Sequence, residues 1–199
     1  FVEAAVARSL SHDGSDRMLA ALALLLELVS RQLPRFIRNA PATTETTEDV
    51  LESPSPACVM SFNAADATGA GGVSGDVSTI AAMGAHGLPI ITSILLRDTA
   101  EVFDHHAIDP DVVAEQARSV LEDITIAAWK VGFLGSAEAV GAVAEILSDY
   151  PDVPLVAYMP NLSWLEEDQQ QAYLDAFREL VLPQTEVLVG SHQTLTDFL

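Results

Sequence analysis

From residue 57 onward, short apolar runs alternate with stretches whose apolar residues recur at helical spacing. Such alternation predicts a mostly parallel central sheet with helices on both faces, the α/β class. The predicted strands are 57–62, 88–96, 125–134, 153–159 and 186–190. The predicted helices are 72–84, 110–123, 136–149 and 166–181.

The residues before this region have a different character. Residues 16–33 predict one helix that is apolar nearly all round, needs a covering partner and ends at Pro34. Residues 41–56 are polar, acidic and framed by prolines, which predicts a linker without regular structure. We therefore divide the chain into a helical segment 1–40, this linker, and an α/β domain 57–199.

The acidic composition of the chain limits the classes of molecule that it is expected to bind. The 199 residues carry 29 Asp and Glu against 9 Lys and Arg, a net charge of −20. Such a surface repels nucleic acid and anionic membranes, so we expect neither as a partner. The single cysteine, Cys58, rules out a disulfide within these residues and fits a reducing cytoplasm. The longest apolar stretch, 18–29, is interrupted by Glu27 and is too short to cross a bilayer.

A glycine-rich loop between the first predicted strand and its helix is the best candidate binding site. It contains Gly69, Gly71 and Gly72, and Asp66 and Asp76 flank it. Glycines let the backbone approach a ligand closely, and the start of a helix offers unpaired N–H donors. The two carboxylates either accept hydrogen bonds from a ligand, or cap a turn (Asp66) and lie on a solvated helix face (Asp76).

The same stretch resembles the N-terminal signature of the hydroxymethylpyrimidine and phosphomethylpyrimidine kinases of thiamine synthesis, A-G-S-D-x-S-G-G-A-G-I-Q-A-D-L-K-T. The positions that fall on it without gaps are Asp66, Gly69, Gly72, Asp76 and Thr79. Residues 84–92 are similar to the family's G-x-x-G-x-x-V-I-T, and residues 130–136 to its K-I-G-M-L-G-S. The resemblance covers residues 57–199.

This resemblance implies a ribokinase-like three-layer sandwich with more strands than the five predicted. In that family the chain continues past the equivalent of Leu199 to a G-[TA]-G-[CD] motif, which holds the anion hole and the catalytic base. The sequence is therefore expected to be incomplete, and no catalytic residue is assigned. Gly14-Ser15-Asp16 and the Ala/Leu-rich helix after it resemble that motif at the opposite end, so a displaced catalytic segment is the alternative.

The resemblance also implies an activity. It is the ATP- and Mg²⁺-dependent phosphorylation of 4-amino-5-hydroxymethyl-2-methylpyrimidine or its monophosphate, by a cytoplasmic homodimer. The expected ligand-binding residues are Asp66, Gly69, Gly71, Gly72, Asp76, Arg97 and Phe133.

Two of these residues depart from the family pattern. Arg97 stands where the family has Gln, and Arg only donates hydrogen bonds, so the substrate stays open. Alternatively, Arg97 pairs with Asp98 or Asp66. Phe133 replaces a Met, and it either stacks on a flat ligand ring or packs in the core.

Other departures concern the metal and the phosphates. Tyr158 occupies the position of a family Asp near the metal, and Ser191 and Thr194 replace an Asn and a Glu that order metal-bound water. These losses weaken the case for Mg²⁺. They keep open a second hypothesis, a non-catalytic binding or regulatory protein of the same fold.

Lysine and histidine offer few further candidates. Lys130 is the only lysine, and it either binds a phosphate or extends to the surface. His105 and His106 are adjacent, so their rings diverge, and no spacing such as H-E-x-x-H is present. We expect this pair in a surface loop rather than at a metal.

Overall fold

The computed structural model describes residues 55–199, so the expectations for residues 1–54, including the 16–33 helix and the Gly14–Asp16 alternative, lie outside the described residues. The strands are β1 (Cys58–Asp66), β2 (His86–Arg97), β3 (Val102–Ala107), β4 (Ala128–Val131), β5 (Leu155–Met159) and β6 (Val187–Gly190). The helices are α2 (Gly72–Ala82), α3 (Pro110–Leu121), α4 (Ala137–Ser148), α5 (Glu167–Ala176) and α6 (His192–Phe198).

One six-stranded sheet forms the centre, in the order β3-β2-β1-β4-β5-β6. All neighbouring strands are parallel except β2 and β3, which form an antiparallel hairpin. After β1, the chain adds β2 and β3 on one side of it. It then crosses over and adds β4, β5 and β6 on the other side of β1. This reversal makes the carboxyl ends of β1 and β4 a topological switch point, where open α/β sheets bind ligands.

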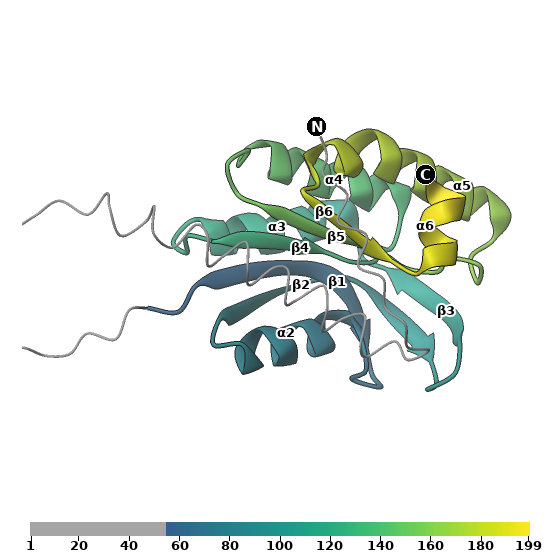
Figure 1. Cartoon of the computed structure of the whole chain (residues 1–199), viewed down its shortest axis with the longest axis horizontal. Helices are drawn as coiled ribbons and strands as arrows, with labels where there is room; N and C mark the ends of the chain where they lie inside the picture. The colour runs from purple at the N-terminus through teal and green to yellow at the C-terminus, as the bar shows by residue number, and fades with distance from the viewer. Residues whose placement is uncertain (1–54) are drawn as a thin grey trace, which may run out of the picture.

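Helices cover both faces of the sheet, as Figure 1 shows for α2 on one side and α4 and α5 on the other. The larger core cluster joins residues of α3, α4 and α5 to alternate residues of the strands, such as Met60 and Phe62. A smaller apolar cluster on the α2 face includes Val59 and Ile80. The predicted three-layer α/β architecture is therefore confirmed.

Local signals explain where the helices begin. The Asp109 side chain accepts a hydrogen bond from the Asp111 amide at 2.9 Å, and Pro110 occupies the first helical position of α3. Ser136 caps α4 in the same way, because its hydroxyl accepts from the Ala139 amide at 3.2 Å. Both starts match the sequence prediction.

Two elements were not predicted, β3 and α6. In β3 only Val102 and His105 are half-buried and the other four residues are exposed, because this strand lies at the edge of the sheet and pairs only with β2. It therefore lacks the apolar run that indicates a buried strand. Helix α6 has 7 residues, too few for a clear helical period. The structure also ends α5 in a π-helical turn, Phe177–Val181.

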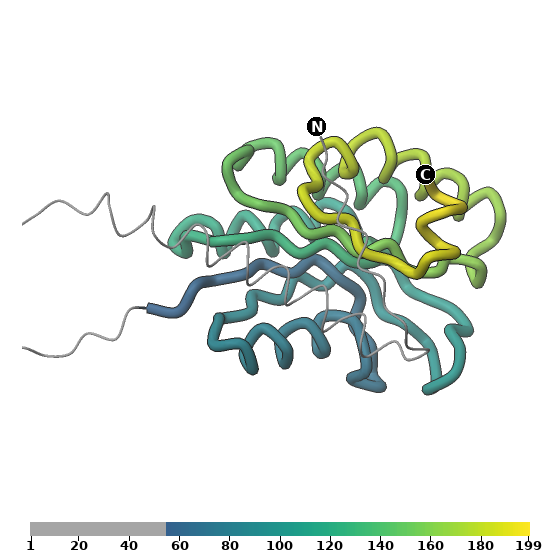
Figure 2. The backbone as a smooth tube through the Cα atoms, in the orientation of Figure 1, coloured from purple at the N-terminus to yellow at the C-terminus, as the bar shows by residue number. Residues whose placement is uncertain are grey.

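None of the helices in residues 55–199 is long and apolar enough to cross a membrane. Figure 2 shows that the turn after β1 and the turn of the β2–β3 hairpin lie at the same end of the molecule.

Acidic side chains outnumber their cationic partners in the described region. Each lysine and arginine there forms one ion pair; the pairs are Arg97–Asp66, Arg118–Glu145, Lys130–Asp76 and Arg178–Asp175. The other carboxylates form no ion pair with a lysine or arginine among the described residues, and most of them repel one another across the folded surface.

We expect the folded state to gain stability with added KCl. Raising the salt from about 0.1 M to about 1 M shortens the Debye length from about 10 Å to about 3 Å, which screens this repulsion. The thermal midpoint should rise by about 5 °C or more, mostly below about 0.5 M, in a calorimetric scan. A midpoint that is flat in this range, or that rises only at higher salt, would contradict the screening argument.

Candidate functional site

The carboxyl edge of the sheet gathers most of the predicted ligand residues. Asp66 ends β1 and is paired with Leu95 of β2, and Arg97 ends β2. The glycine-rich loop follows β1, and Phe133 follows β4. The topology therefore brings together residues that are far apart in the sequence at the switch point.

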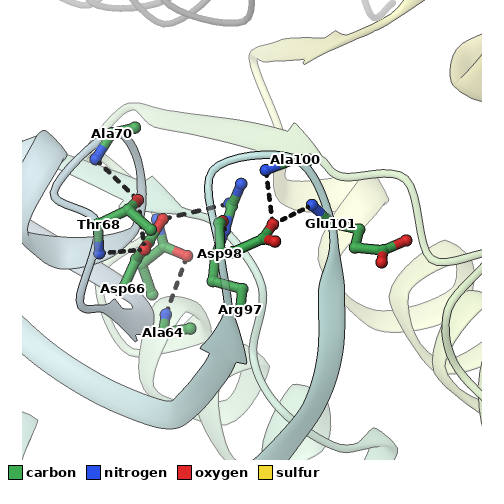
Figure 3. A network of polar contacts seen from close by, with 9 residues as sticks. Ala64, Asp66, Thr68, Ala70, Arg97, Asp98, Ala100 and Glu101 are labelled. Atoms are coloured by element: carbon green, nitrogen blue, oxygen red, sulfur yellow. Dashed lines mark hydrogen bonds and ion pairs between the residues drawn. The ribbon is translucent and has the colours of Figure 1, made fainter.

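Asp66 organises the glycine-rich loop. Its Oδ1 accepts hydrogen bonds from the Thr68 amide at 2.9 Å and the Thr68 hydroxyl at 2.7 Å, as Figure 3 shows. Its backbone oxygen accepts from the Gly69 amide at 3.1 Å. The turn-capping interpretation of Asp66 is therefore confirmed, and a contact with a ligand stays a prediction.

Arg97 lies across the other oxygen of Asp66. Its Nη1 is 3.3 Å from Asp66 Oδ2, and its Nε donates to the Asp98 backbone oxygen at 2.9 Å (Figure 3). The side chain is 22% exposed, so it can also meet a ligand at this edge. Asp98 in turn accepts from the amides of Glu101 and Ala100, and these hydrogen bonds lower the pKa of its carboxyl. The hairpin turn that carries Arg97 is thereby fixed.

The loop needs glycine at Gly72 for a steric reason. Gly72 has φ +60°, and a Cβ there would lie 2.3 Å from the Ala64 backbone oxygen. Gly69 also has positive φ, +71°, but nothing lies within 4 Å of its Cβ position. Helix α2 begins after Gly71 without a side-chain cap, so the amides of its first turn are available to an anion.

Asp76 lies in the interior rather than on a solvated helix face, so that part of the sequence interpretation is wrong. Asp76 is a residue of α2, and its side chain is fully buried between the helix and the sheet. Its Oδ2 accepts from Ser61 Oγ at 2.6 Å, Asn63 Nδ2 at 2.9 Å and Lys130 Nζ at 2.7 Å. Its Oδ1 has no hydrogen-bond partner within residues 55–199. A contact between Asp76 and a ligand stays a prediction.

Lys130 does not extend to the surface, so that alternative is wrong, and binding of a phosphate by Lys130 stays a prediction. It is buried and forms the ion pair with Asp76, because Ser61 of β1 and Lys130 of β4 are paired neighbours below α2. Sequence spacing does not indicate this pair, since the two residues are 54 positions apart. An isolated buried charge is costly, so each member of the pair requires the other.

Phe133 is a core residue in the described structure, with 4% of its surface exposed. Its amide donates to Asn63 Oδ1 at 3.1 Å, and its ring packs against Tyr173 at 5.4 Å between centroids. The Tyr173 hydroxyl accepts from the Leu134 amide at 3.1 Å, and burial raises the pKa of Tyr173. These contacts fix the segment after β4, and stacking of Phe133 on a ligand stays a prediction.

Sequence analysis did not predict that His105 and Trp164 lie beside the candidate site. The predicted surface loop is wrong, because both histidines lie in β3, and only His106 is exposed. His105 is half-buried, and its Nε2 lies 2.9 Å from the Gly135 backbone oxygen. Its ring contacts both Phe133 and Trp164 at 5.3 Å between centroids. Alternation along an edge strand was the signal that could have separated the two histidines.

Of the residues that replace the family's metal and phosphate groups, Ser191 caps a helix. Ser191 Oγ caps α6 by accepting from the Thr194 amide at 3.0 Å, and the two hydroxyls are 2.7 Å apart. Tyr158 is half-buried in β5. In the described part of the chain, no group of three or more His, Cys, Asp or Glu residues could hold a metal ion. Tyr158, Ser191 and Thr194 themselves offer no carboxylate oxygen to Mg²⁺.

The fold and the position of the loop define an α/β protein with a candidate ligand site at its switch point. Residues 66–197 match the phosphomethylpyrimidine kinase family. The chain therefore belongs to the phosphomethylpyrimidine kinase family, as its motifs indicated.

Known proteins of two kinds resemble the chain in sequence. It is 39% identical over 85 residues to the hydroxymethylpyrimidine/phosphomethylpyrimidine kinase of Escherichia coli, covering 43% of this chain and 32% of that protein. It is 30% identical over 159 residues to the thiamine biosynthetic bifunctional enzyme TH1 of Arabidopsis thaliana, covering 79% of this chain and 30% of that protein. The matches thus span about a third of the length of these relatives.

Solved structures agree with the fold. The phosphomethylpyrimidine kinase of Clostridium difficile has a TM-score of 0.60 at 24% identity, covering 66% of this chain and 58% of that one. The pyridoxal kinase of Bacillus subtilis, solved as an ADP complex, has a TM-score of 0.59 at 20% identity, covering 67% and 51%. At these identities the likeness shows the fold alone.

Gly69 and Gly72, the two glycines of the loop with positive φ, give a matched pair of substitutions. We expect Gly72→Ala to lower the free energy of unfolding by about 3 kcal/mol or more, because left-handed strain adds to the clash with the Ala64 oxygen. Gly69→Ala has only the left-handed strain and should cost about 1–2 kcal/mol. Denaturant unfolding of both variants measures the difference, and equal losses would contradict the steric role of Gly72.

Proposed function

We propose that this chain contributes the substrate-binding part of an enzyme that phosphorylates 4-amino-5-hydroxymethyl-2-methylpyrimidine, or its monophosphate, from ATP in thiamine biosynthesis. Membership of the phosphomethylpyrimidine kinase family supports the reaction. The observation that best supports a ligand site is the Asp66–Arg97 ion pair. It lies beside the glycine-rich loop, at the switch point of the sheet.

In this proposal the loop and the pair bind complementary parts of the ligand. The amides after Gly71 face polar or anionic groups, and a phosphate on the substrate suits the start of α2. The Arg97 guanidinium donates to acceptor atoms of the ring or of a phosphate. Asp66 already holds the Arg97 side chain in place, so binding of a ligand costs little further conformational entropy of this side chain.

The described residues are assigned binding rather than phosphoryl transfer. Tyr158, Ser191 and Thr194 offer no carboxylate to Mg²⁺, so no step of the reaction is placed on them through that metal. Only membership of the family supports the part of the proposal that concerns ATP and Mg²⁺. We also propose a cytoplasmic protein, in line with its single cysteine.

Calorimetry with the hydroxymethylpyrimidine tests the site. We expect Arg97→Ala to weaken binding by about 10-fold or more, because a charged hydrogen bond is removed. Arg97→Gln restores a side chain that both donates and accepts, and it should recover part of the affinity. Arg118→Ala serves as the matched control, since Arg118 pairs with Glu145 away from the loop.

Equal affinity in Arg97→Ala and wild type would remove Arg97 from the site. Asp76→Ala is a poor probe, because it would leave Lys130 buried without its partner. ADP release that depends on the pyrimidine, measured with ATP and Mg²⁺ on the full-length protein that contains this chain, tests the reaction itself. Binding without any release would favour the second candidate, a non-catalytic binding protein, which the changes at Tyr158, Ser191 and Thr194 support.

We further propose a homodimer that pairs through the β2–β3 hairpin. Ile94, Leu96 and Phe103 are large apolar side chains exposed on this hairpin, and Phe103 is 60% exposed. Strand β3 is also an unpaired edge of the sheet. Both features suit contact with a second copy of the chain.

Light scattering should therefore give a dimer mass for the wild type and a monomer mass for Phe103→Glu. A charge at Leu180 is the control, because this exposed leucine lies at the end of α5, away from the hairpin. A monomeric wild type would rule out the dimer, and a dimer that survives Phe103→Glu would rule out this interface.

A further inference from the structure

Two partly exposed rings cover the buried ring of Phe133. His105 comes from β3, and Trp164 comes from the loop after β5. The three rings contact one another at 5.3 Å between centroids, each pair edge to face with interplanar angles of 69°, 76° and 72°. Because Phe133 is almost fully covered, a ligand at this end of the site meets His105 and Trp164 rather than Phe133.

The register of the sheet places these rings opposite the Asp66–Arg97 pair. Asp66 is paired with Leu95, and Leu95 is paired with His105. Paired residues on neighbouring strands point to the same face, and two strand spacings separate Asp66 from His105 by about 10 Å. A single-ring heterocycle with its substituents spans such a separation, with Leu95 beneath it.

Both rings are held by hydrogen bonds of their own. The Gly135 oxygen can only accept, so His105 Nε2 donates to it at 2.9 Å, and Nδ1 is the acceptor of the neutral ring. Trp164 Nε1 donates to the Asn161 oxygen at 3.0 Å. The rings are therefore oriented before a ligand binds, which lowers the entropy cost of binding.

We infer that His105 and Trp164 form an aromatic wall of the ligand site that selects planar heterocycles carrying an amino or hydroxyl donor. The rings contact the ligand ring, and His105 Nδ1 accepts the donor. This inference rests on the proposed function, because it extends the same site. It assigns to these two residues the ring-contacting role that sequence analysis gave to Phe133.

Tryptophan fluorescence tests the wall directly. The 199 residues contain two tryptophans, and Trp129 is buried in the core against Phe62. Titration with 4-amino-5-hydroxymethyl-2-methylpyrimidine should therefore change the emission of Trp164. The response should disappear in Trp164→Phe, while calorimetry still detects binding because the phenyl ring preserves part of the contact.

His105 has a matched control in its neighbour. We expect His105→Ala to weaken binding about 10-fold, as an aromatic contact and a hydrogen bond together contribute about 1.4 kcal/mol. His105→Phe keeps the ring and should recover part of this loss. His106→Ala should bind as wild type does, since His106 is exposed and its side chain points to the opposite face of β3.

The outcomes separate the two proposals. A wild type that gives no calorimetric heat with the pyrimidine overturns the proposed function and the wall with it. A wild type that binds while Trp164 emission stays constant and His105→Ala keeps full affinity overturns the wall alone. If His105→Ala fails to fold in a thermal scan, the Trp164 emission of the wild type still decides the question.

Discussion

The ion pair between Lys130 and Asp76 is the constraint around which the described structure is arranged. It joins α2 to β1 and β4 in the interior, and Ser61 and Asn63 complete the donors around one carboxylate oxygen. A buried pair of this kind tolerates little displacement, because separation would leave two charges without solvent. Helix α2 is therefore held at one position on the sheet, and the loop before it is held as well.

The two aspartates that flank the loop have different tasks. Asp66 shapes the loop and anchors Arg97 at the accessible edge, whereas Asp76 secures the helix from below. Asn63 connects the second task to the segment after β4, since it contacts both Asp76 and the Phe133 amide. The accessible polar groups thus stand on a rigid interior network, as a precise binding site requires.

The sequence predicted those parts of the structure that depend on neighbouring residues. The helix start at Asp109 and Pro110 and the strand–loop–helix around Gly72 follow from local chemistry and periodicity. The exposed edge strand β3 gave no apolar run, so it was missed. The Asp76–Lys130 pair and the His105–Trp164 contact depend on which strands become neighbours, and the order of strands across a switch point is not contained in local patterns.

The burial of Lys130 has a practical consequence for chemical labelling. It is the only lysine in these 199 residues, so the folded surface offers amine-reactive reagents no ε-amino group. Acylation of Lys130 requires that α2 separate from β1 and β4, which makes the rate of modification a measure of that opening. The chain thus carries its own reporter for local unfolding beneath the ligand site, without any engineered probe.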